Sequence, residues 1–218
     1  MKPFLITIFA ACVAHASIIV SVDGPPAPIL SGTDAGDYLY SYTAELAGDE
    51  SLDPAATGGA SCLGVGGILA ECVPSGTFFT IYDTAGLVGV GSAPADWIVL
   101  VQLTGMTPSN ICGSCIDDPL IPNITFLYTG PVVHADGIDT PIPGFQIIST
   151  LGGITGGVFS SQSTLDVGPL SGDTDQVYGG VGVPGFGIST VQDSPEPSTL
   201  LMIGAGLLGV VRLRRSPR

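Results

Sequence analysis

The sequence predicts an all-β fold, an antiparallel β-sandwich of roughly seven to nine strands, and three observations support this prediction. Short apolar segments rich in β-branched and aromatic residues recur along the chain, which is the composition of strands. Clusters of Asp, Gly, Ser and Pro separate these segments and have the chemistry of turns. Between the two ends no segment has a convincing apolar period of 3.6 residues, so helices are not expected there.

Seven segments are expected to form strands, in the order in which they follow one another along the chain. In the first segment three tyrosines alternate with smaller residues, so their side chains share one face of the strand. Aromatic residues at such positions, Trp97 included, lie more often in a core than on a sugar-stacking platform. The expected strands are 38–46, 77–82, 97–103, 123–128, 145–150, 157–165 and 186–191.

The connections between these strands carry turn residues and two glycine-rich stretches. Turns are expected at 83–86, 117–119, 136–137 and 171–173. The stretch 58–67 is expected to be a flexible loop, and 179–187 a connection to the last strand. Residues 180–185 match the dinucleotide-binding pattern G-x-G-x-x-G, but Pro184 and the lack of a following helix pattern argue against such a site.

The charged residues of the chain are divided between its body and its ends. All 19 acidic residues lie between residues 3 and 211, an interval without a single Lys or Arg. A body without basic side chains cannot neutralise phosphates, which excludes nucleic acid as a partner and argues against a phosphate site built on Lys or Arg. The five basic residues are Lys2, Arg212, Arg214, Arg215 and Arg218, and the net charge is −14.

The N-terminus has the three parts of a secretory signal peptide. Lys2 is followed by an apolar run over 4–13 and then by Ala14-His15-Ala16, the small-residue pattern that precedes a cleavage site. Cleavage after Ala16 would make Ser17 the first residue. The general secretion machinery and signal peptidase are therefore expected partners. Two alternatives are a buried N-terminal strand or helix and a lipidated Cys12.

The C-terminus also has three parts. Pro195-Glu196-Pro197 precedes an uncharged apolar stretch over 198–211, and an arginine cluster follows. As a helix this stretch would span about 21 Å, which is short of the ~30 Å hydrocarbon core. We therefore expect transient insertion into the inner membrane. The cluster, formed by Arg212, Arg214 and Arg215, is expected to stay cytoplasmic, which leaves the body outside.

These three parts together resemble the PEP-CTERM sorting signal, the mark of exosortase substrates in Gram-negative bacteria. The resemblance covers 194–218 and implies processing near the Pro-Glu-Pro motif by exosortase, followed by release or attachment at the cell surface. Such proteins are associated with extracellular polysaccharide and biofilms. The sequence thus divides into a signal peptide at 1–16, an acidic β-sandwich domain at 17–193 and a sorting segment at 194–218.

Four cysteines remain after signal removal, which favours disulfides in an exported protein. The pairs Cys62–Cys72 and Cys112–Cys115 close short local loops and are the favoured pairing. Redox work by the C-x-x-C at 112–115 and zinc binding are the competing interpretations. A zinc ribbon fits poorly because the first pair has the wrong spacing.

Candidate catalytic residues are few, and none is assigned. After removal of residues 1–16, His134 is the only histidine, so a site with several histidines cannot be built. Acidic pairs at 117–118 and 173–175, and the acids at 136 and 139, are expected to be turn residues, with calcium binding as the alternative. No cofactor, metal or enzyme activity is expected.

The function expected from the sequence is therefore that of an exported, exosortase-sorted surface or matrix protein in the exopolysaccharide layer. The alternative is a carbohydrate-binding or calcium-dependent module, with a secreted hydrolase as the third candidate. Exopolysaccharide is a candidate partner in the first two cases.

Overall fold

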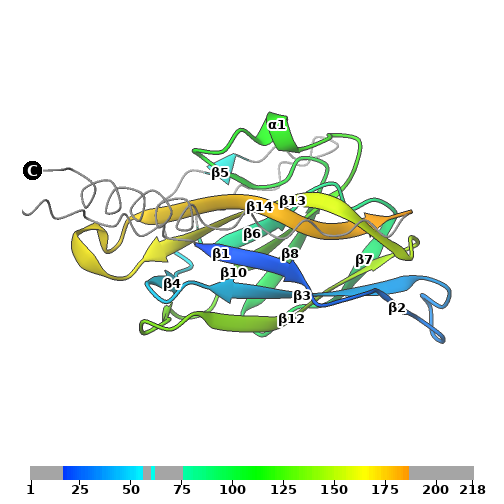
Figure 1. Cartoon of the computed structure of the whole chain (residues 1–218), viewed down its shortest axis with the longest axis horizontal. Helices are drawn as coiled ribbons and strands as arrows, with labels where there is room; N and C mark the ends of the chain where they lie inside the picture. The colour runs from blue at the N-terminus through cyan, green and yellow to red at the C-terminus, as the bar shows by residue number, and fades with distance from the viewer. Residues whose placement is uncertain (1–16, 56–59, 62–75, 187–218) are drawn as a thin grey trace, which may run out of the picture. The chain divides into compact units, whose positions relative to one another are not determined.

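The computed structural model describes residues 17–55, 60–61 and 76–186 of the chain (Figure 1). All of them fall within one compact unit, Ala16–Pro195. The expected signal helix and C-terminal helix lie outside the described residues. Within the described part of the chain, no helix is long and apolar enough to cross a membrane.

The described residues form mostly β-structure in two antiparallel sheets, and the first sheet has five strands. β3 lies between β1 and β12, and its register places Leu46 opposite Ile18 on one side and Ser41 opposite Gln146 on the other. The strands follow the order β1-β3-β12-β7, with the short β2 also paired to β3. Their bounds are β1 Ile18–Val22, β2 Ala27–Pro28, β3 Tyr38–Leu46, β7 Leu87–Ser92 and β12 Thr140–Ser149.

The second sheet has seven strands, in the order β11-β4-β13-β6-β10-β8 with β14 paired along β13. β13 and β14 form a long twisted hairpin, coloured yellow to orange in Figure 1. The bounds are β4 Glu50–Leu52, β6 Phe78–Ile81, β8 Trp97–Gln102, β10 Asn123–Tyr128, β11 Val133–His134, β13 Gly153–Leu165 and β14 Thr174–Gly185. The remaining elements are β5 Ala60–Ser61 paired with β9 Thr107–Pro108, the helical turn α1 Gly113–Ile116 and the 3-10 turn η2 Gly168–Leu170.

An aromatic core joins the two sheets. Phe145 of β12 packs edge-on against Phe79 and Trp97 of the second sheet, with ring centroids 4.8 and 5.1 Å apart. Phe126 of β10 stacks on Phe79 at 4.9 Å. These side chains, with Tyr40 of β3, are among the buried residues of the main core cluster. Edge-on and stacked contacts of this kind favour close packing between aromatic rings.

The segment 103–122 covers the part of the other face of the second sheet that β6 and β10 form. Phe78 and Leu127 of the sheet form a second small cluster with Met106 of that segment. The Tyr82 hydroxyl lies 2.7 Å from both the Thr107 and the Ser160 hydroxyl, and it donates to the Met106 carbonyl at 3.0 Å. Every residue of β6 and β10 is buried as a result, because one face meets the first sheet and the other meets this segment.

Two of the expected strands have the observed bounds, the strands at 77–82 and 97–103 are slightly shorter than expected, and others are longer or were not expected. The strands at 38–46 and 123–128 occur as β3 and β10. β12 begins at Thr140, earlier than expected. Its first part can contain Pro141 and Pro143 because β12 pairs there with β3 alone, and its other edge needs no N–H donor. β1 and β7 were not expected. The sheets have five and seven strands, more than the seven to nine in all that the sequence predicts, and several of these strands contain only two or three residues.

In the glycine-rich stretch 179–187, residues 179–185 are not a connection, as the sequence predicts, but form the second half of β14. Its glycines make room for side chains of the paired strand β13. A Cβ atom on Gly179 would lie 2.8 Å from Phe159 Cε1, and one on Gly185 would lie 2.7 Å from Thr155 Cβ. The expected strand at 186–191 lies outside the described residues except for Phe186, which follows β14.

Candidate functional site

The acidic residue Glu50 is buried at one end of the second sheet. It begins β4, and its side chain has no exposed surface. The Ser163 hydroxyl of β13 donates to Glu50 Oε2 at 2.9 Å. The Ser17 hydroxyl lies 2.5 Å from that of Ser163. Three residues that are far apart in the sequence thus form one buried polar chain: Ser17, Ser163 and Glu50.

The second oxygen of this carboxyl group has no hydrogen bond of good geometry. Glu50 Oε1 and Asp175 Oδ2 are both buried and both without such a bond. Burial raises the pKa of Glu50 to about 8; the hydrogen bond from Ser163 opposes this rise, while the charges of Asp175 and Asp49 and a hydrogen bond with Asp175 add to it. Glu50 is therefore largely protonated at neutral pH while Ser17 is still joined to residue 16. No sequence pattern pointed to Glu50, because its burial depends on β13 and β14, more than 100 residues later in the chain.

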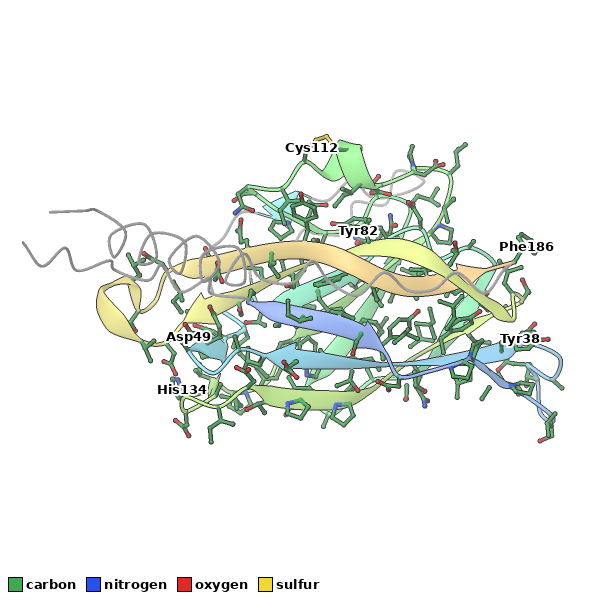
Figure 2. The ribbon with its side chains drawn as sticks, in the orientation of Figure 1. Tyr38, Asp49, Tyr82, Cys112, His134 and Phe186 are labelled. Atoms are coloured by element: carbon green, nitrogen blue, oxygen red, sulfur yellow. A yellow bond between two sulfur atoms is a disulfide. The ribbon has the colours of Figure 1, made fainter. Side chains whose placement is uncertain are left out.

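His134 and Asp166 lie near the same end of the domain, on its surface. His134 Nδ1 is 2.6 Å from Asp166 Oδ2, and 53% of the histidine side chain is exposed. Figure 2 shows His134 and Asp49 at one end of the domain, and Tyr38 and Phe186 at the other. His134 lies in the short strand β11. Its contact with Asp166 connects β11 to the turn that follows β13.

A second acidic group surrounds the turn after β6. Asp83 Oδ1 accepts the amide N–H of Asp118 at 2.9 Å, and Asp117 Oδ2 accepts that of Gly105 at 3.0 Å. Asn123 donates its side-chain N–H to Asp117 Oδ1 at 2.8 Å. Burial, and then the nearby Asp117 and Asp118, raise the pKa of Asp83 above its usual value. These contacts are those of turn-forming aspartates, and in the described residues no three acidic, Cys or His side chains are grouped to hold a metal ion.

Trp97, Tyr40 and Tyr42 do not form the sugar-stacking platform that the sequence left open. Trp97 is only 8% exposed and packs between Tyr128 and Phe145 in the core. Tyr40 and Tyr42 share one face of β3, as expected, and that face is also buried. The alternation of aromatic residues therefore reflects packing between the sheets.

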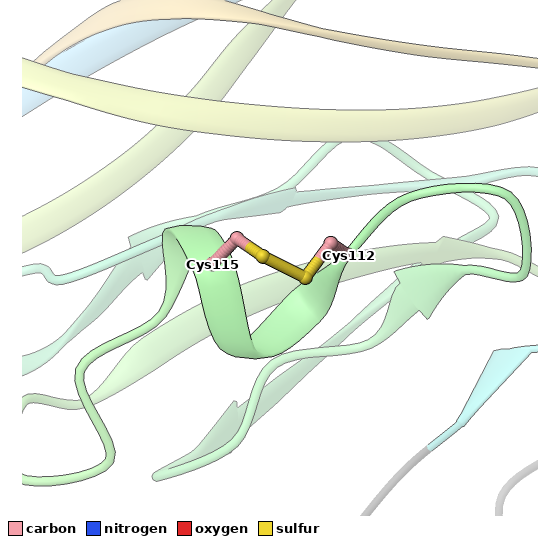
Figure 3. Close-up of a disulfide and its surroundings, with 2 residues drawn as sticks. All are labelled: Cys112 and Cys115. Atoms are coloured by element: carbon pink, nitrogen blue, oxygen red, sulfur yellow. A yellow bond between two sulfur atoms is a disulfide. The ribbon is translucent and has the colours of Figure 1, made fainter.

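Cys112 and Cys115 form a disulfide across α1, with Sγ atoms 1.96 Å and Cα atoms 5.3 Å apart (Figure 3). The helical turn α1 has only four residues and lies between β9 and β10, which both belong to antiparallel sheets. The βαβ unit expected around a redox motif is not seen around this disulfide in the described residues. Cys62 and Cys72 lie outside the described residues.

Most of the predicted processing residues also lie outside the described part of the chain. These are Ala14 and Ala16 at the expected cleavage site, Pro195, Glu196 and Pro197 of the motif, and the cluster Arg212, Arg214 and Arg215. Ser17 is the exception. It is fully buried, and its carbonyl accepts the amide N–H of Ala47 at 3.1 Å.

Comparison with known proteins concerns the C-terminal residues. Residues 195–215 match the family model of the PEP-CTERM protein-sorting motif. This match agrees with the resemblance seen in the sequence, and it indicates an exported protein that exosortase sorts. No curated protein and no solved structure gives a significant match to this chain, and the family of its β-domain is not recognised.

Proposed function

We propose that this chain is an exported surface or matrix protein without catalytic activity, sorted by exosortase and structural or adhesive in the exopolysaccharide layer. The observation that carries the proposal is the match of 195–215 to the PEP-CTERM motif. In this proposal signal peptidase removes 1–16, the acidic domain at 17–193 crosses the inner membrane, and the segment at 194–218 anchors it there transiently. Exosortase then processes the chain near Pro195-Glu196-Pro197.

The charge distribution supports an extracellular role for the domain. Residues 17–197 contain all 19 acidic residues and no Lys or Arg, so like charges keep the domain soluble. The buried aromatic residues and the turn-forming aspartates supply structure, as described above. The alternative, a carbohydrate-binding or calcium-dependent module, draws no support from Trp97 because that side chain lies in the core.

Cell fractionation in a host that contains exosortase tests this proposal. The full chain is compared with a variant in which Arg212, Arg214 and Arg215 are changed to Gln. We expect the wild-type protein at the cell surface or in the medium, and we expect the triple variant in a different cell fraction. Arg218→Gln is the matched control because this arginine lies outside the matched residues. An unchanged location of the triple variant would contradict the sorting mechanism.

A further inference from the structure

We propose that the α-ammonium group created when signal peptidase frees Ser17 is held at the carboxyl group of Glu50 and stabilises the mature domain. This inference rests on the proposed processing after Ala16. It assigns to the N-terminus of the mature chain a binding site within the second sheet, formed by Glu50 of β4 with Ser163 of β13.

Two connections hold Ser17 close to Glu50. Through the backbone, Ala47 donates its N–H to the Ser17 carbonyl at 3.1 Å, and the Ala47 carbonyl accepts the N–H of Glu50 at 3.0 Å. Through the side chains, Ser163 bridges the Ser17 hydroxyl and Glu50 Oε2 at 2.5 and 2.9 Å. Ser17 and Glu50 are both without exposed surface. Ser17 is therefore linked to Glu50 by two routes, each of two hydrogen bonds, through Ala47 and through Ser163.

The charges around this site favour a cation. Asp175 of β14 and Asp49, which precedes β4, are the acidic neighbours that act on Glu50. Glu50 Oε1 and Asp175 Oδ2 are buried and make no hydrogen bond of good geometry, although the two carboxyl groups are close enough to share a proton. Residues 17–197 contain no Lys or Arg that could meet this need, so the α-ammonium is the only permanent candidate within that part of the chain. A buried carboxylate is stable only when it is paired and hydrogen-bonded, and the same holds for a buried ammonium.

The pairing also orders the events of export. A peptidase must reach the bond between residues 16 and 17, yet Ser17 is fully buried in the folded domain. Cleavage therefore precedes the closure of this end of the sandwich. Cleavage then supplies the positive charge that the folded site binds, so processing stabilises the folded domain.

The lysine content of the chain permits a direct test. Lys2 is the only lysine and is removed with the signal peptide, so amine-reactive reagents modify the mature protein at its α-amino group alone. The full chain is exported, and the intact mass of the mature protein shows where it begins. A first residue other than Ser17 would overturn the proposed processing, and this inference with it. If the mature chain begins at Ser17, the proposed processing is correct, and the later measurements test only the pairing of the α-ammonium with Glu50.

That mature chain is modified in denaturant and refolded. Acetylation removes the positive charge, whereas reductive dimethylation adds bulk on the same nitrogen and retains the charge. We expect acetylation to lower the ratio of folded to unfolded protein in urea at pH 7 by about tenfold or more relative to dimethylation, which corresponds to a pKa difference of about one unit. Equal effects of the two modifications would overturn the inference.

A second measurement uses the unmodified mature chain and needs no refolding. The pH dependence of the reaction of the α-amino group with a trace of acetic anhydride yields its pKa. We expect this pKa to be at least about one unit higher in the wild type than in Glu50→Gln. Glu45→Gln is the matched control because Glu45 is exposed on β3 opposite Ile19, and it should leave the pKa unchanged. The same pKa in the wild type and Glu50→Gln would contradict the pairing.

Discussion

The ring of Phe145 in β12 meets the ring of Phe79 in β6 edge-on, with centroids 4.8 Å apart and planes at 86°. This contact crosses from one sheet to the other at the centre of the aromatic core. Both side chains are fully buried. Phe145 therefore contributes directly to the packing between the two sheets.

The change Phe145→Ala should destabilise the domain by about 3 to 5 kcal/mol, because it removes apolar contacts and leaves a cavity between the sheets. Urea unfolding followed by tryptophan fluorescence is a suitable measurement, since Trp97 contacts the same ring. Phe186→Ala is the control: Phe186 is 95% exposed, and its loss should change the stability little. Similar losses in the two variants would refute this role for Phe145.

The hydroxyl of Tyr82 should hold the segment 103–122 on the second sheet. Tyr82→Phe leaves the buried Thr107 and Ser160 hydroxyls and the Met106 carbonyl without this partner. We expect a loss of about 1 to 3 kcal/mol in the free energy of unfolding, with faster amide hydrogen exchange in 103–108. Tyr178→Phe, at a side chain that is 63% exposed, should have little effect. Unchanged exchange in Tyr82→Phe would show that other contacts hold the segment.

The stability of the unprocessed chain should depend on pH through Glu50. Burial raises the pKa of Glu50 from 4.5 to about 8, so the folded state binds this proton more tightly than the unfolded state. The stabilising contribution is complete below pH 4.5 and is lost as the pH rises through about 8. Urea titration of the full-length chain, with Ser17 still joined to residue 16, should show a slope of up to about 1.4 kcal/mol per pH unit in this window.

Variants separate this effect from that of the other acids. In Glu50→Gln, which resembles the protonated carboxyl group, the slope that Glu50 contributes should disappear. Glu45→Gln should keep it, because Glu45 is exposed on β3. Parallel pH profiles for the wild type and Glu50→Gln would contradict the assignment to Glu50.

Glycine in the β13–β14 hairpin should matter only where a neighbouring side chain occupies the space of its missing Cβ. Gly179→Ala places a Cβ 2.8 Å from Phe159 Cε1, which should destabilise the domain by about 1 to 3 kcal/mol. Gly156→Ala has no atom within 4 Å of the new Cβ and should be neutral or slightly stabilising. Thermal unfolding of the two variants tests this difference. If Gly156→Ala were the more damaging change, the close packing at Gly179 would not be the reason for its glycine.

Sequence patterns predicted the strands that are rich in aromatic and β-branched residues and failed at the glycine-rich strand β14. β3 has Tyr at every second position from Tyr38 to Tyr42, and four of the six residues of β10 are aromatic or β-branched, so their bounds were predicted correctly. β14 contains Gly179, Gly180, Gly182 and Gly185, and glycine usually indicates a loop. It is a strand because it pairs along the whole of β13, and because its glycines admit the Phe159 and Thr155 side chains.

By itself the sequence determined where this protein is directed, since the sorting motif at 195–215 is a linear pattern and needs no fold to be recognised. It also determined the all-β class, because alternation and turn chemistry are local properties. Only the tertiary structure decided which acid is buried. Glu50 looks like any of the 19 acidic residues in the sequence, and it becomes distinct because Ser17, which precedes β1, Ser163 of β13 and Asp175 of β14 surround it in the fold. Burial is a property of the packed sheets, and no short segment carries it.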